Sequence, residues 1–170
     1  MSKLFIIIVY LFFLILPHSI FSKNIKIYSI IKLENSIPEE CGIKLLFEKG
    51  NIEMNVKIKK INNETYTYFE AISLGKKFEN VDIITENLSI VELISTEPQF
   101  MKNKIFFEIN TNKNEIAKNQ TANFFQNLIV SGGKIIIDSQ TFEISGPVDS
   151  KVRLEYLFCT GEMFHPKYDK

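Results

Sequence analysis

Cysteine and histidine, the side chains best suited to nucleophilic and base catalysis, are rare in this chain. Downstream of residue 22 the sequence contains two cysteines, Cys41 and Cys159, and one histidine, His165. A Cys159–His165 pair can do nucleophilic chemistry only if Cys159 is a free thiolate beside an oriented imidazole. An even number of cysteines in an exported chain predicts a disulfide instead. We therefore expect a Cys41–Cys159 bridge, which would remove that nucleophile; two buried thiols that act as small apolar residues are the alternative. We predict no catalytic residue.

Other motifs with a known chemistry are missing from the sequence. It contains no Cys-x-x-Cys pair, no His-Glu-x-x-His motif and no acidic loop with calcium-ligand spacing. Gly132 and Gly133 follow a predicted helix, whereas a phosphate-binding glycine loop precedes one. We therefore predict no metal site and no cofactor.

The N-terminal segment predicts export. Lys3 is followed by an unbroken apolar run from Leu4 to Leu16, then by Pro17 and a short stretch that ends at the small residue Ser22. This order is typical of a secretory signal, and the run is shorter than the roughly 20 apolar residues of a membrane-spanning helix. We expect a signal peptide over residues 1–22, cleavage near Ser22, and a periplasmic or extracellular protein that meets the membrane only during export. A retained anchor is the alternative.

The charges of the chain are balanced. The sequence has 20 Lys and Arg residues and 20 Asp and Glu residues. Loss of the leader would remove only Lys3, leaving 19 basic against 20 acidic residues. Proteins that bind nucleic acid carry a basic face, so we predict no nucleic-acid partner.

Most of the remaining chain has the pattern of short β-strands. Apolar and polar residues alternate from Ile52 to Lys59, which is typical of a strand with one buried face. Tyr66, Tyr68 and Phe69 lie on another strand, where they either fill cross-strand pairs or line a ligand groove. Several short strands joined by turns predict an antiparallel β-sandwich or a barrel-like sheet. The further strands are expected at residues 23–33, 43–48, 65–73, 81–85, 88–96 and 104–110, with a loop at 34–42.

Near residue 112 the period of the apolar residues changes. Asn112 precedes Glu115 by three positions, as at a helix N-terminus, and apolar residues then recur at intervals of three and four. We expect one amphipathic helix at residues 113–131, packed on the sheet, and then a hairpin with strands at 134–138 and 141–145. The fold class that we predict is therefore mainly β with some α (α+β).

Residues 151–158 can be read in two ways. As a helix capped by Asp149, the segment would bury Leu154, Leu157 and Phe158. As a strand, it would show alternate residues to the core. The periodicity of so short an apolar run does not decide between these readings.

The order of elements in this half of the chain resembles that of a known family. Residues 125–133 form a predicted helix that ends in glycine, and 134–137 and 142–146 form a hairpin that also ends in glycine. This order is similar to the closing half of the invasion-associated-locus-B envelope proteins of α-proteobacteria. The paired cysteines and the tryptophan-containing opening of that family have no counterpart here. The resemblance implies an exported β-rich module and no particular site residue.

Together these patterns predict a signal peptide, one domain over residues 23–160 and a tail at 161–170. The function that we expect is non-catalytic binding by an exported envelope protein. Its partner would be another envelope protein, met through an edge strand or through the strand face that carries Lys57 and Lys59. The second hypothesis is a carrier of a small apolar ligand or lipid. The third is an enzyme without a recognisable motif.

Overall fold

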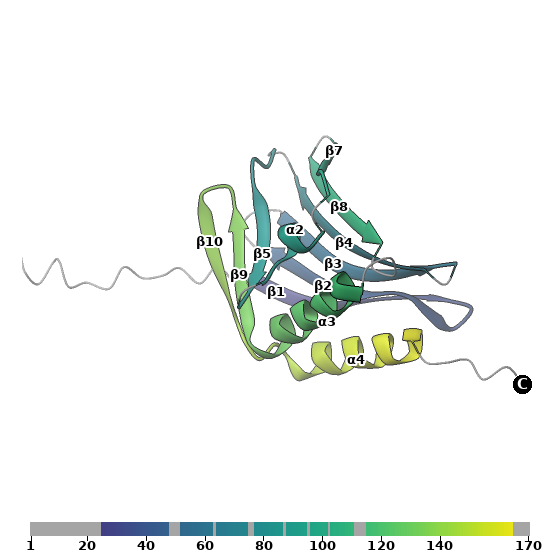
Figure 1. Cartoon of the computed structure of the whole chain (residues 1–170). Helices are drawn as coiled ribbons and strands as arrows, with labels where there is room; N and C mark the ends of the chain where they lie inside the picture. The colour runs from purple at the N-terminus through teal and green to yellow at the C-terminus, as the bar shows by residue number, and fades with distance from the viewer. Residues whose placement is uncertain are drawn as a thin grey trace, which may run out of the picture.

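The structure is a computed structural model, shown in Figure 1. It describes residues 25–47, 52–62, 64–74, 77–86, 88–94, 96–101, 103–110 and 115–164. The predicted signal peptide, His165 and the residues after it lie outside this set.

The described residues form two antiparallel sheets and three helices. The first sheet has the strand order β1-β2-β3-β4-β8-β7, with bounds β1 Ile25–Glu34, β2 Ile37–Phe47, β3 Ile52–Ile61, β4 Glu64–Ser73, β8 Lys104–Asn110 and β7 Gln99–Met101. The second has the order β10-β9-β5-β6, with bounds β10 Gln140–Ser145, β9 Gly132–Ile137, β5 Val81–Thr85 and β6 Leu88–Ser89. The helices are α2 Ile90–Ile94, α3 Glu115–Val130 and α4 Ser150–Phe164. The prediction of a mainly β chain with some helix is confirmed.

One face of the first sheet is covered and forms much of the core. Alternation along β3 places Met54, Val56 and Ile58 on this face, where Val56 lies opposite Phe69 of β4. Helix α4 packs against β1 and β2, and α3 packs against α2, β5 and β9 (Figure 1). The largest fully buried side chains of α3 are Phe124, Phe125 and Leu128, so the predicted amphipathic helix is confirmed.

The loop predicted at residues 34–42 is wrong. Asn35 and Ser36 have φ values of 50° and 65° and form a two-residue turn between β1 and β2. Such turns join antiparallel strands directly because their twist matches that of the strands. Pro38 is accommodated within β2 because the register of the β1–β2 pair shifts beside it, at a bulge-like irregularity.

The strand predicted at residues 88–96 is also wrong. Strand pairing covers only Leu88 and Ser89, and the chain then turns into α2. The hydroxyl of Ser89 accepts a hydrogen bond of 3.0 Å from the backbone N–H of Glu92, which is the arrangement of a helix N-cap. The apolar run alone could not reveal this short helix, and the short strand β7 was not predicted either.

Residues 151–158 are helical, but the prediction of which side is buried is wrong. Val152, Tyr156, Cys159 and Met163 face the sheet, whereas the side chains predicted to be buried, Leu154, Leu157 and Phe158, are 54%, 57% and 71% exposed. The reason is the disulfide, which turns Cys159 toward β2 and brings the residues three or four positions away to the same face.

Helix α4 begins where it was predicted to begin but ends later than predicted. Asp149 caps it, as predicted, by accepting a 2.8 Å hydrogen bond from the backbone N–H of Lys151. The helix continues to Phe164, past the predicted start of the tail at residue 161. Met163 anchors this last turn because only 1% of its surface is exposed.

A candidate ligand groove between α3 and α4

Helices α3 and α4 run antiparallel to each other. The backbone N–H of Val148 donates a 3.0 Å hydrogen bond to the carbonyl of Ile129, which joins the start of the α4 segment to the end of α3. From this junction the two helices lie side by side across the first sheet (Figure 1). They therefore form the two walls of an elongated depression.

The depression is an open groove of about 750 Å³. Its floor is formed by Ile58 of β3 and Thr65 of β4. Apolar side chains dominate its walls, including Ile129 and Val130 from α3 and Leu154, Leu157 and Phe164 from α4. The volume lies within the roughly 300–1,000 Å³ typical of small-molecule sites.

Large apolar side chains along this groove remain exposed. Val130 is 50% exposed and Phe164 is 47% exposed, and Leu154 and Leu157 are more than half exposed. Single exposed apolar residues need no explanation, but a contiguous apolar surface around a groove indicates a binding site. Leu154 and Leu157, which sequence reasoning placed in the core, thus line the groove, whereas Phe158 lies outside it.

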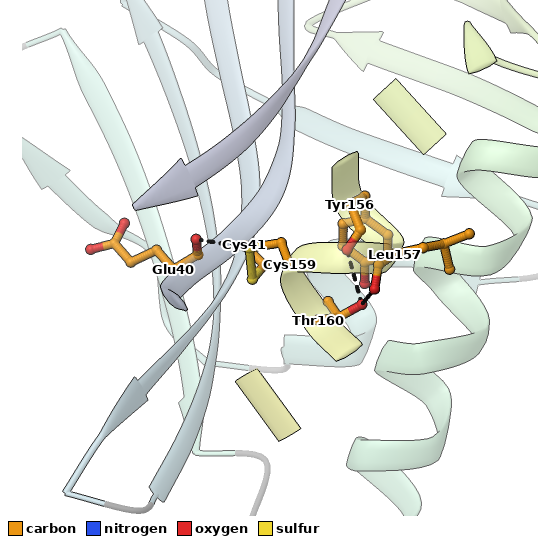
Figure 2. Close-up of a disulfide and its surroundings, with 6 residues drawn as sticks. All are labelled: Glu40, Cys41, Tyr156, Leu157, Cys159 and Thr160. Atoms are coloured by element: carbon orange, nitrogen blue, oxygen red, sulfur yellow. Dashed lines mark hydrogen bonds between the residues drawn. A yellow bond between two sulfur atoms is a disulfide. The ribbon is translucent and has the colours of Figure 1, made fainter. Parts of the chain in front are cut away.

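A disulfide fixes one wall of the groove. Figure 2 shows the bond between Cys41 on β2 and Cys159 on α4. Their Cα atoms are 5.8 Å apart. Both cysteines are buried. The predicted bridge is therefore present, and it holds α4 against the first sheet.

Tyr156 links the two walls beneath the groove. Its ring stacks on Phe125 of α3, with the ring centroids 5.0 Å apart. Burial raises the pKa of the Tyr156 phenol, so this side chain stays neutral. The hydroxyl of Thr160 donates a 2.9 Å hydrogen bond to the Tyr156 carbonyl (Figure 2), which leaves little unpaired polarity on this stretch of wall.

Two cationic residues line the groove, one near each end. Lys118 lies near the start of α3, whereas Arg153 lies near the start of α4, and antiparallel helices place these starts at opposite ends. The side chain of Arg153 is half-buried. Its Nε is shielded from solvent and has no hydrogen-bond partner among the described residues. Sequence reasoning assigned no role to Arg153 and missed this position.

The strand face that carries Lys57 and Lys59 provides its own counter-charges. Lys57 lies 2.9 Å from a carboxylate oxygen of Glu40, and Lys59 lies 3.3 Å from Glu39 and 3.4 Å from Glu40. Burial alone would raise the pKa of Glu40, but the hydrogen bond and charge of Lys57, together with Lys59, hold that pKa below its usual value. The lysines are thus engaged within the sheet.

The aromatic cluster divides between the two faces of the first sheet. Phe69 is buried and stacks on Phe107 at a centroid distance of 5.6 Å. Tyr68 lies on the opposite face and packs against Phe106 and Tyr66. Burial, and secondarily the charge of Glu108, raise the pKa of Tyr68 to about 12. Phe69 and Tyr68 thus pair with rings of the neighbouring strand β8, and none of the three residues lines the groove.

Residues suited to catalysis do not converge in the part of the chain that the structure describes. Cys159 is oxidised, so the thiolate of the considered Cys159–His165 pair does not exist, and His165 lies outside the described residues. The described residues contain no cluster of three or more His, Cys, Asp or Glu side chains suited to a metal ion. None of the helices within the described ranges is both long and apolar enough to cross a bilayer.

Comparison with protein-family models, with curated proteins and with solved structures gave no match.

Proposed function

We propose that this chain is an exported, non-catalytic binding protein that takes an acyl-chain ligand in the groove between α3 and α4. The observation that carries the proposal is the open groove of about 750 Å³ with exposed apolar walls. Covering such a surface with a ligand is favourable by about 25 cal/mol for each Å² of apolar area removed from water.

The shape of the groove favours a chain-like ligand. Helix α4 has 15 residues, which span about 22 Å at 1.5 Å per residue. Groove-lining residues occur from Ser150 to Phe164, so the apolar strip follows the whole helix. An extended hydrocarbon chain would gain about 0.8 kcal/mol for each methylene that it buries there.

Two observations support export. The N-terminal segment has the pattern of a secretory signal, and the protein contains a disulfide, which persists in oxidising compartments. We therefore place the protein in the periplasm or outside the cell, where an exposed acyl chain needs a shielded site.

A second candidate function is binding of another envelope protein by strand addition. Strand β1 is an edge of the first sheet, and its Ile31 and Leu33 are 44% and 58% exposed. Exposed edge strands offer unpaired backbone groups to a partner strand. We favour ligand binding in the groove over strand addition at β1, because the groove is a site with a defined volume and chemistry.

A tryptophan reporter tests the groove directly. The chain has no Trp, so a Leu157→Trp variant places one fluorophore in the groove wall without background. Phe158→Trp is the matched control, because Phe158 is the next residue on α4, is 71% exposed and does not line the groove. Titration with hexadecanol, an uncharged ligand, should shift the emission of Leu157→Trp to the blue and leave Phe158→Trp unchanged. Equal responses, or none, would contradict the proposal.

A further inference from the structure

Arg153 places a positive charge at one end of an apolar groove, and no carboxylate of the described residues forms an ion pair with it. Its Nε is buried and makes no hydrogen bond to the described residues. The neighbouring carboxylates are engaged elsewhere. Glu155 accepts a hydrogen bond from Ser29 and pairs with Lys151. Asp149 accepts a hydrogen bond from the backbone N–H of Lys151.

A guanidinium whose Nε–H is shielded and has no partner carries a physical cost. Arginine carries five N–H donors in a planar fork. A shielded donor without a partner loses its hydration and gains no hydrogen bond in return. An anion that meets the fork would remove this cost, and the positive end of the α4 dipole would add to the attraction.

We propose that the groove selects acyl chains that end in a carboxylate, with the carboxylate on Arg153. This inference rests on the proposed function of the groove. The hydrocarbon would run from Arg153 past Leu154 and Leu157 toward Phe164, all of which line the groove. A small rotation of the flexible Arg153 side chain lets Nε and a terminal nitrogen donate to the two oxygens of one carboxylate.

A carboxylate fits this end of the groove better than a phosphate does. Among the described residues that line the groove, Arg153 is the only cation near the start of α4. Lys118 lines the opposite end. One guanidinium balances one negative charge and matches a carboxylate in bidentate geometry. A doubly charged phosphate would retain excess charge beside Ile129 and Val130, which are apolar.

The test compares two ligands of equal chain length, hexadecanoate and hexadecanol, with the Leu157→Trp protein as reporter. With Arg153 intact, the acid should bind about 10- to 100-fold more tightly than the alcohol, as expected for a charge-assisted hydrogen bond. Arg153→Gln should abolish this preference and leave hexadecanol binding within about 2- to 3-fold. Arg153→Lys should retain part of the preference, since it keeps the charge but loses the fork.

Two matched variants control for net charge and position. Lys151→Gln removes the same charge from the same helix. The Lys151 side chain is 79% exposed and lies outside the groove lining, so this variant should leave the preference for the acid intact. Lys118→Gln removes the groove-lining cation at the other end, so its effect on the preference tests which end of the groove holds the carboxylate. Circular dichroism of each variant establishes that it is folded.

The outcomes separate this inference from the proposed function. Equal binding of acid and alcohol by the reporter protein would overturn the role of Arg153 and leave the groove as an apolar site. Loss of the preference in Lys118→Gln but not in Arg153→Gln would place the carboxylate at the Lys118 end of the groove and would overturn the inference. Tighter binding of hexadecyl phosphate than of hexadecanoate would overturn the choice of head group. Failure of both hexadecanoate and hexadecanol to bind would overturn both proposals.

Discussion

Removal of the disulfide should destabilise the fold and open the groove at the same time. The bond closes a loop with a sequence separation of 118 residues. In the chain-entropy model, a loop of this length removes about 4.9 kcal/mol of unfolded-state freedom, and native disulfides of small secreted domains are typically worth about 2–5 kcal/mol. We therefore expect the Cys41→Ala/Cys159→Ala variant to lose about 2–5 kcal/mol of its free energy of unfolding.

The assay is urea denaturation followed by circular dichroism. With a slope of about 2 kcal/mol per molar urea, this loss lowers the midpoint by roughly 1–2.5 M. Wild-type protein in a reducing buffer should behave like the double variant, whereas the double variant should not respond to reductant. In the Leu157→Trp background, the double variant should also bind hexadecanol more weakly, because α4 is a groove wall. Midpoints that agree within about 0.3 M would refute the reasoning, since α4 would then be held by packing alone.

Three further predictions concern the groove, the core and the charged face. Ala122→Trp, which fills the groove from α3, should abolish hexadecanol binding measured by calorimetry, whereas Asn123→Trp, at the next and likewise exposed residue outside the lining, should not. Phe125→Ala should cost about 3–5 kcal/mol in urea denaturation, because Phe125 is fully buried and stacks on Tyr156; a loss under 1 kcal/mol would contradict the packing described. The lowered pKa of Glu40 predicts stability that is present above the usual glutamate pKa of 4.5 and is lost as the pH falls through the lower folded-state value. Glu40→Gln should flatten that acid dependence of the melting temperature, and an unchanged profile would show that the Lys57 and Lys59 contacts do not hold in solution.

The elements with a long, regular pattern could be predicted from the sequence. The strict alternation in β3 and the three- and four-residue spacing in α3 each specify one buried face, so both were placed nearly at their observed bounds. The cysteine pair was also predictable, because two cysteines in a chain that is predicted to be exported favour one bond.

Local patterns could not reveal features that depend on tertiary contacts. The cap of α2 is a single serine within an apolar run, and the β1–β2 turn uses Asn35 and Ser36 without a glycine signal. The buried side of α4 follows from the bond at Cys159, since the helix has apolar residues on more than one side.

The groove was missed for the same reason. Leu154 and Leu157 are apolar, and a pattern alone cannot distinguish a core residue from one that lines an open site. If the phase of the helix had been set from the disulfide, these leucines would have been placed away from the sheet. The role of Arg153 depends on the neighbours that it lacks, which no local sequence pattern records.

The most direct test of the central claim is mass spectrometry of what the native protein carries. Protein expressed from the full-length sequence with residues 1–22 included, purified without detergent and extracted with organic solvent, should release a fatty acid in a near-stoichiometric amount. Ala122→Trp protein prepared in the same way should release none above a blank. An extract of the unmodified protein that contains no acyl chain, or equal amounts from both proteins, would contradict the claim that the α3–α4 groove is the binding site.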